Sequence, residues 1–367
     1  MPLTEEVLHL AAFVAGVYVV ARTMLGAIRA FVLTRGSNDP LIRAFFLVMR
    51  RFFGLIAHRG KSYAWQDRVL AYYPPVSLVL LPTYWIALVG TGYTLIFWAL
   101  GAGSLADSFR LSGSSILTLG FASSPVPGAS LAAFTEAALG LILVALLISY
   151  LPTIYGAFSR RELLVNLLEV RADSPPSAVV LLTRAHRLRG LDALHEIWER
   201  WEPWFSELEE THTSLPILVF YRSQQADHSW VNAAEAIMDT AALARSVVDI
   251  PLDVQADLTI RAGYLAMRRI ADYFFLRYDA HPPQDAPTSI SRELFERVCD
   301  VLAADGVPLK ADRDQAFLDF NGWRVNYDAP VLTLARITTA PPSWWTRPMV
   351  SAYITDEPVL ARPVQGG

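Results

Sequence analysis

The sequence predicts an all-α membrane protein: three transmembrane helices per subunit, a re-entrant helix and loop between the last two, and a cytoplasmic helical bundle. Long apolar runs are concentrated in the first 160 of its 367 residues. Only 18% of the chain is charged, against about 25% in soluble domains. After residue 160 the composition is that of an ordinary soluble domain. There, apolar residues recur at helical spacing and no alternating strand series appears.

The first predicted span covers Val7 to Leu33 within a first region, residues 1–34. Its two arginines, Arg22 and Arg29, lie toward one end, where long basic side chains can reach the interface. Glu5 and Glu6 precede the apolar run without a basic segment, so we expect no cleavable signal peptide.

A connector, residues 35–70, follows the first span. It contains a basic amphipathic stretch, Leu41 to Ile56, in which four phenylalanines alternate with three arginines. Such a helix is expected to lie flat on a membrane surface.

Two further spans are predicted in residues 71–160, at Val76 to Leu105 and at Leu131 to Phe158. The first of them has thirty residues without a charge, and the only charge in the second is Glu136. Both exceed the roughly 20 residues that a helix needs to cross a bilayer.

Basic residues set the predicted orientation. Seven lysines and arginines between Arg35 and Arg68, against two acids, favour a cytoplasmic connector. The N-terminus and residues 101–130 are then outside, and everything after Arg160 is inside. The chain is expected in the cell membrane as a multi-pass protein in contact with lipid. Its net charge of −4, with scattered basic residues, gives no indication of a nucleic-acid partner.

Residues 161–340 are predicted to form a cytoplasmic helical regulatory domain. Its expected helices are Leu191 to Leu208, Trp230 to Val248, Val254 to Tyr278, Ser291 to Ala304 and Ala311 to Asn326. Leu215 to Tyr221 fits a strand or a buried helical turn. Residues 341–367 hold five prolines and are expected to form an extended tail.

The stretch from Leu111 to Pro125, LSGSSILTLGFASSP, lies between the last two spans and carries no charge. Ser104 to Leu117 is long enough for a half-length helix, and Thr118 to Ala122 follows directly. Non-helical backbone at membrane depth is tolerated only where protein buries it or where it lines a watery cavity. Backbone carbonyls there can replace the hydration shell of an ion. At Gly120 the lack of a side chain allows carbonyl orientations that a bulkier residue would resist.

The segment SSILTLGFA resembles the pore loop of tetrameric potassium channels, whose filter reads Thr-Val-Gly-Tyr-Gly. The matching residues are Thr118, Leu119, Gly120, Phe121 and Ala122, within a similar frame of span, short helix, filter and span. The resemblance covers about residues 70 to 160. It implies a homotetramer around one pore, no catalysis, no cofactor, and no metal beyond permeant K⁺ bound by the Thr118 hydroxyl and the carbonyls of residues 118 to 121.

The loop departs from the family at three positions. Ala122 replaces the last glycine, Ser123 stands where an aspartate often follows, and Phe121 lacks the tyrosine hydroxyl that braces the filter. A less well-held filter could pass sodium too, so a non-selective cation channel remains the first alternative.

Several residues around the loop are candidates for supporting roles. Ser114, Ser115 and Glu136 are the expected filter support, with Glu136 bonded to Ser114 or Thr118. The other possibility for Glu136 is a simple interfacial contact. Intramembrane acids are functional candidates by default.

The third span is the expected gate. In the family that the loop resembles, a glycine at the position of Gly140 often serves as a hinge. Small residues equally serve close helix packing. Pro152 interrupts the backbone ladder near the cytoplasmic end. Val144, Ile148 and Tyr155 could share a pore-facing stripe with Gly140 and close it by dewetting. Replacing Ile148 with Asn should then raise basal conductance.

Other classes of protein are less well supported. The second alternative is a membrane-anchored sensor or scaffold in which the loop is merely structural. No nucleophile–base arrangement suggests an enzyme. His195 with Glu199 and Glu209 with His212 have metal-ligand spacing, but they lie in a strongly acidic stretch that fits a solvated face better. No series of arginines at every third residue suggests a voltage sensor. The ligand of the cytoplasmic domain is not indicated by the sequence.

Overall fold

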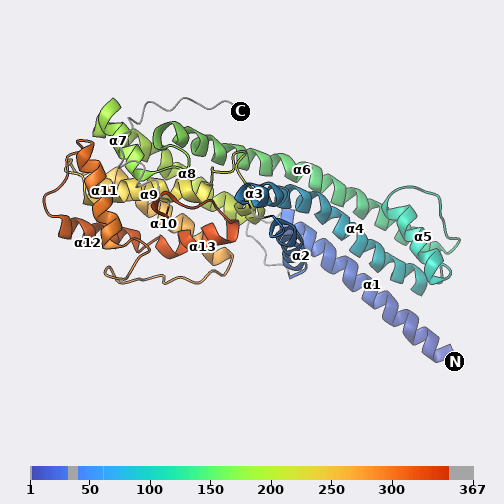
Figure 1. The fold of residues 1–367 in the computed structure, drawn as a ribbon. Helices are drawn as coiled ribbons and strands as arrows, with labels where there is room; N and C mark the ends of the chain where they lie inside the picture. The colour runs from blue at the N-terminus through green and yellow to red at the C-terminus, as the bar shows by residue number, and fades with distance from the viewer. Residues whose placement is uncertain (1, 32–39, 61, 347–367) are drawn as a thin grey trace. The chain divides into compact units, whose positions relative to one another are not determined.

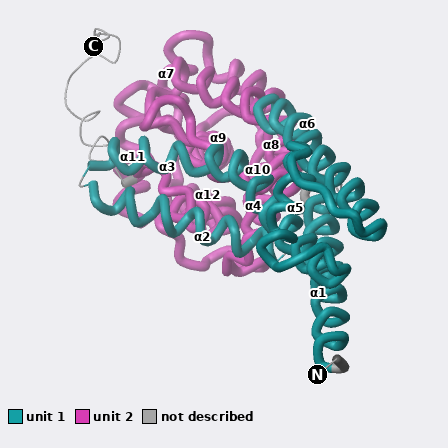
Figure 2. Tube along the Cα trace, turned by 90° about the vertical axis from the view of Figure 1, so that its right-hand side faces the viewer, with its two compact units in different colours: residues 1–156 teal, residues 157–367 magenta. Residues whose placement is uncertain are grey.

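The computed structural model describes residues 2–31, 40–60 and 62–346, which form thirteen α-helices and three short 3₁₀ helices (Figure 1). These described residues contain no β-strand. The chain divides into two compact units, residues 1–156 and 157–367 (Figure 2). Unit 1 contains α1 (Pro2–Phe31), α2 (Pro40–Ala57), α3 (Tyr63–Ala71), α4 (Tyr73–Ala99), α5 (Leu105–Ile116) and most of α6 (Pro127–Ala172).

Three segments of the described residues are long and apolar enough to cross a membrane. They are Thr4–Arg29, Tyr63–Ala99 and Pro127–Ala172. The prediction of an all-helical chain with three membrane-length apolar helices is therefore confirmed. The second span ends at Ala99, before the predicted Leu105, because residues 100–104 turn into the separate helix α5.

Helices α1 and α4 pack closely through two glycines. A Cβ on Gly16 would lie 2.5 Å from the Gly92 carbonyl oxygen, and one on Gly92 would lie 2.7 Å from the side chain of Val20. Small residues let membrane helices approach each other in this way. The Gly-Thr-Gly stretch at residues 90–92 therefore has a packing role.

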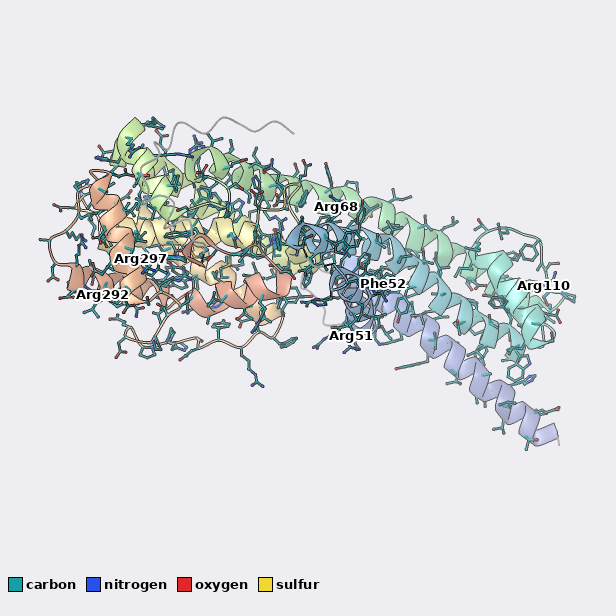
Figure 3. All side chains as sticks on the ribbon, viewed as in Figure 1. Arg51, Phe52, Arg68, Arg110, Arg292 and Arg297 are labelled. Carbon is teal, nitrogen blue, oxygen red and sulfur yellow. The ribbon has the colours of Figure 1, made fainter. Side chains whose placement is uncertain are left out.

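Helix α2 is amphipathic, as predicted. Phe53 and Ala57 are buried, whereas Phe52 and Leu55 are exposed beside Arg51 (Figure 3). Its buried side meets α4, since the Tyr73 hydroxyl donates to the Phe46 carbonyl oxygen at 3.4 Å. An exposed face that mixes phenylalanine, leucine and arginine is typical of helices that lie in a membrane interface.

Unit 2 is a helical bundle around one apolar core. Its helices begin with the end of α6 and continue with α7 (Ala178–Leu188), η1 (Leu191–Ala193), α8 (Leu194–Ser214), η2 (Pro216–Phe220), α9 (Trp230–Ser246), α10 (Val254–Tyr273), α11 (Arg292–Ala304), α12 (Arg313–Arg324), α13 (Asp328–Thr338) and η3 (Trp344–Thr346). Large side chains such as Trp198, Phe205 and Phe320 are almost fully buried at its centre.

Unit 2 differs from the sequence-based expectation in three places. Helices α7 and α13 were not predicted, and Leu215 to Tyr221 forms the 3₁₀ helix η2 instead of a strand. Trp344 and Trp345, assigned to the extended tail, are buried in the core. The remaining tail positions, 347–367, lie outside the described residues.

Candidate functional site

Helix α5 positions the segment that follows it. The helix begins with a capping box in which the Ser104 hydroxyl and the Asp107 side chain each bond the other residue's backbone N–H. Farther along, the Ser112 hydroxyl donates to the Gly90 carbonyl oxygen of α4 at 2.9 Å. At its last residue, Ile116, the carbonyl oxygen would lie 2.3 Å from a Cβ on Gly140 of α6. The end of α5 is thus held against both neighbouring spans.

These contacts place the end of α5 well inside the two spans. Gly90 lies nine residues before the end of α4, and Gly140 lies thirteen residues after the start of α6. At 1.5 Å per residue these separations are about 14 and 20 Å, about half and two thirds of a hydrocarbon core about 30 Å thick. The backbone after Ile116 therefore begins near mid-membrane depth, if α4 and α6 cross the bilayer.

All backbone N–H groups of residues 117–122 except that of Phe121 bond to the end of α5. Leu119 and Gly120 donate to the Ser114 carbonyl oxygen at 2.8 and 3.3 Å. Ala122 donates to the Ser114 hydroxyl at 2.9 Å. Thr118 donates to the Ser115 carbonyl oxygen at 2.9 Å. Ser114 therefore contacts three residues of the predicted filter, whereas the Ser115 hydroxyl bonds within α5, to Leu111.

The carbonyl groups of the same residues have no such partners. Among the described residues, no hydrogen bond reaches the carbonyl oxygens of residues 118 to 121. Thr118 and Gly120 have positive φ angles of 55° and 70°, whereas Leu119 and Phe121 between and after them do not. The segment is also open, since the Leu119 and Phe121 side chains are 62% and 61% exposed.

Glu136 lies behind α5 with a different partner from the expected one. The structure corrects the predicted bond to Ser114 or Thr118, because Glu136 Oε1 lies 2.5 Å from the Ser112 hydroxyl oxygen, within hydrogen-bond distance. Glu136 is fully buried, and its second oxygen has no hydrogen-bond partner among the described residues. The acid therefore connects α6 to the helix that carries the loop, one turn away from the loop itself.

The residues of the predicted gate differ in their exposure on α6. Gly140 is buried against Ile116, so it does not share an exposed stripe with the other three. Val144, Ile148 and Tyr155 are exposed and lie on one flank of the helix. Pro152 lies inside α6, which continues without interruption to Ala172. The observed contact explains Gly140 as a packing residue, and its role as a hinge stays a prediction.

The C-terminal extension of α6 is anchored in unit 2 by Arg161, which sequence reasoning did not single out. Its guanidinium group donates to the carbonyl oxygens of Leu218 and Tyr221, both at 2.8 Å, and to the Glu162 carboxylate. It is only 4% exposed and stacks over the rings of Phe158 and Trp230. Motion of the η2 segment would therefore be transmitted to α6.

The histidines with metal-ligand spacing have other partners. His195 contacts Asp253 at 3.0 Å, which raises the pKa of the imidazole. His212 is buried beside Arg161, whereas Glu209 pairs with Arg269 on α10. Within the part of the chain that the structure describes, no group of three or more potential metal ligands is assembled.

Comparison with known proteins identifies no relative of this chain. No family model, no curated protein and no solved structure matches this chain.

Proposed function

We propose that this chain is one subunit of a cation channel, in which the carbonyl oxygens of residues 118 to 121 bind permeant ions. The observation that carries the proposal is the one-sided hydrogen bonding of the loop: the N–H groups of Thr118, Leu119, Gly120 and Ala122 are paired with the end of α5, whereas the carbonyls of residues 118 to 121 have no partner among the described residues. An unpaired backbone group in hydrocarbon costs several kcal/mol. Carbonyl groups without a hydrogen-bond donor at that depth need water or a cation as a partner.

Several copies are needed to complete such a site. One chain supplies a single strip of carbonyls, whereas a dehydrated cation is held by rings of carbonyl oxygens from several strips. The open position of the loop leaves it accessible to neighbouring copies. A fourfold ring, as in the family that the loop resembles, would place Val144, Ile148 and Tyr155 along the conduction path and let Arg161 couple unit 2 to the gate.

The preferred ion is potassium, with a non-selective cation channel as the alternative in the same class. Ala122 and Phe121 are the residues whose departure from the family favours relaxed selectivity. A sensor or scaffold without conduction is the alternative in a different class.

The test is ion flux through purified protein in liposomes, in an Ile148→Asn background that opens the proposed gate. We expect potassium flux that Gly120→Asp abolishes. Gly101→Asp is the matched control, because Gly101 also has a positive φ, 78°, and open space around its Cα, but it lies at the end of α4. Sodium flux at a similar rate would favour the non-selective channel. No flux from folded protein that is monomeric in detergent would favour the sensor or scaffold.

A further inference from the structure

Unit 2 contains a pocket between α6, α7 and α8 that neither the loop nor the gate explains. Its volume is about 280 Å³. Leu168, Leu181 and Trp201 form its buried floor, and Val170 and Leu188 form an apolar rim that is 75% and 70% exposed. Apolar side chains gathered at the rim of a pocket are typical of a surface that is covered by a ligand.

The charge around this pocket is strongly one-sided. Four arginines line it against a single acid, Glu196, and they come from α6, α7 with its C-cap, and α8. Arg189 holds Glu196 with two hydrogen bonds of 3.0 and 3.1 Å. Arg184 pairs with Asp173 at 3.2 Å. The positive charges of Arg171 and Arg200 are not matched by acids of their own.

Both unmatched arginines line the pocket, Arg171 from α6 and Arg200 from α8. Arg189 is the main cause that lowers the pKa of Glu196, and Arg200 and Arg171 both add to this effect. Arg171 donates to the Leu167 carbonyl oxygen of its own helix. No hydrogen bond or ion pair of Arg200 exists among the described residues. An anionic group entering the pocket therefore finds two available guanidinium groups beside an apolar wall.

We propose that this pocket binds a single-chain anionic amphiphile, with its carboxylate or phosphate between Arg171 and Arg200 and its alkyl chain along Leu167, Val170 and Leu188. The volume favours one chain, because small-molecule pockets start at roughly 300 Å³ and two acyl chains would not fit. The chain of the ligand would supply the cover that the apolar rim lacks.

The pocket lies on the helix that continues from the third span. Arg161 and Arg171 are ten residues apart on α6, about 15 Å along the helix. Binding of the amphiphile to this pocket does not depend on the chain being a channel. Only the further step, in which occupancy would alter the position of α6 and hence conduction, rests on the proposed function.

The test uses the full chain in nanodiscs of zwitterionic lipid and a dodecanoate that carries a diazirine on its alkyl chain. After photolysis, peptide mass spectrometry locates the label, which we expect within residues 164–201. Unlabelled dodecanoate and dodecyl phosphate should compete, and the stronger of them identifies the head group. Dodecyltrimethylammonium, with the same chain and the opposite charge, should not compete.

Paired variants separate specific binding from loss of folding. Arg171→Gln with Arg200→Gln should reduce labelling about tenfold, as the loss of charge-assisted contacts predicts. Leu188→Gln should reduce it severalfold. Arg297→Gln on α11 (Figure 3) and Leu318→Gln on α12, both at exposed helical positions outside the pocket, should leave it unchanged. The proposal fails if the label maps elsewhere, if the cationic amphiphile competes equally, or if the pocket variants label like the controls. Labelling without ion flux would retain the site and reject the channel.

Discussion

The carbonyl groups of two tightly turned segments differ in their hydrogen bonding. The segments are residues 117–122 in unit 1 and residues 216–221 in unit 2. In the second segment, Arg161 donates to the carbonyl oxygens of Leu218 and Tyr221, and the Trp230 indole donates to that of Val219 at 3.2 Å. In the first segment, the end of α5 accepts from the N–H group of every residue except Phe121, and nothing described donates to the carbonyls of residues 118 to 121.

The difference distinguishes a structural segment, whose carbonyls are paired within the protein, from a segment whose carbonyls are left for an external ligand. A buried carbonyl is ordinarily paired within the protein, because an unpaired one loses its hydration without compensation. Two side chains, those of Arg161 and Trp230, donate three hydrogen bonds to the carbonyls of residues 216–221, so the chain is able to satisfy such a segment. Their absence around residues 118 to 121, at the end of a helix held by Gly90 and Gly140, is consistent with a cation as the missing partner.

Removing the donor of the paired segment should have the largest effect. Arg161→Ala leaves two carbonyl oxygens and the buried Glu162 without their partner. We expect the free energy of unfolding of unit 2 to fall by about 3–5 kcal/mol, as for breaking a buried ion pair. Urea unfolding of the full chain in detergent, followed by tryptophan fluorescence, measures it.

The neighbouring arginine is the control for that change. Arg160 is mostly exposed and, within the described residues, pairs with Glu207, which is itself 40% exposed, so Arg160→Ala should have little effect. Equal destabilisation by the two variants would mean that the carbonyl contacts of Arg161 contribute nothing particular.

Unit 2 also contains three buried carboxyl groups that share one arginine. We expect a proton to neutralise one of these acids. Arg324 is shared among Glu235, Asp239 and Asp328. Burial raises the pKa of Glu235 from 4.5 to about 7, and the charge of Asp239 adds to this while Arg324 opposes it. The folded state then keeps a proton that the unfolded chain has lost, so stability should decrease as pH rises from about 4.5 to about 7, by on the order of 2–3 kcal/mol.

Unfolding measured across this pH range checks the sign. Glu235→Gln, which cannot ionise, should flatten the slope, whereas Glu210→Gln at an exposed position should leave it unchanged. A slope that Glu235→Gln leaves unchanged would show that Glu235 holds no extra proton in the folded state.

The position of the unpaired segment depends on the contact between α5 and α6. Gly140→Ala would place a Cβ 2.3 Å from the Ile116 carbonyl oxygen, so we expect destabilisation of about 1–3 kcal/mol from overpacking and loss of flux. Gly113→Ala on α5, where a Cβ meets nothing within 4 Å, should keep both stability and flux. A functional Gly140→Ala channel would show that the depth of α5 is not essential.

The smallest expected effect is at the hydroxyl that holds the end of the loop. Ser114→Ala removes the acceptor of the Ala122 N–H, at a cost of about 1 kcal/mol, and should lower the preference for potassium over sodium. Ser115→Ala removes only a bond inside α5 and should preserve that preference. Ion competition in the flux assay compares the two variants.

Much of the fold was predictable because long apolar runs and helical spacing are local signals. The spans and helices α8 to α12 have such patterns. Helix α13 was missed because Pro330 suggests a break, yet a proline is tolerated in the first turn of a helix. Helix α7 begins at Ala178, just after Pro175-Pro176. It was not predicted because two consecutive prolines indicate a break in helical structure. The burial of Trp345 depends on its bond to Asp239 at 2.6 Å, across more than a hundred residues, which no local pattern contains.

For the candidate site, the sequence predicted which residues form the loop but not what they contact. Ser112 and Ser114 point to different sides of α5, and only the rotation of that helix decides which of them meets Glu136. The carbonyl contacts of Arg161 span 57 and 60 residues. Its identity as a basic residue after a span suggested only an interfacial position.

The central claim is tested most directly by observing the carbonyls themselves. The dipeptides Gly-Phe, Phe-Ala and Tyr-Arg each occur once in the sequence. Paired ¹³C-carbonyl and ¹⁵N labelling therefore isolates the carbonyls of Gly120, Phe121 and Tyr221 in solid-state NMR spectra of the protein in lipid. We predict that the Gly120 and Phe121 signals shift when potassium replaces N-methylglucamine, while the Tyr221 signal, already paired with Arg161, does not. Unchanged Gly120 and Phe121 signals in folded protein at saturating potassium would contradict the account.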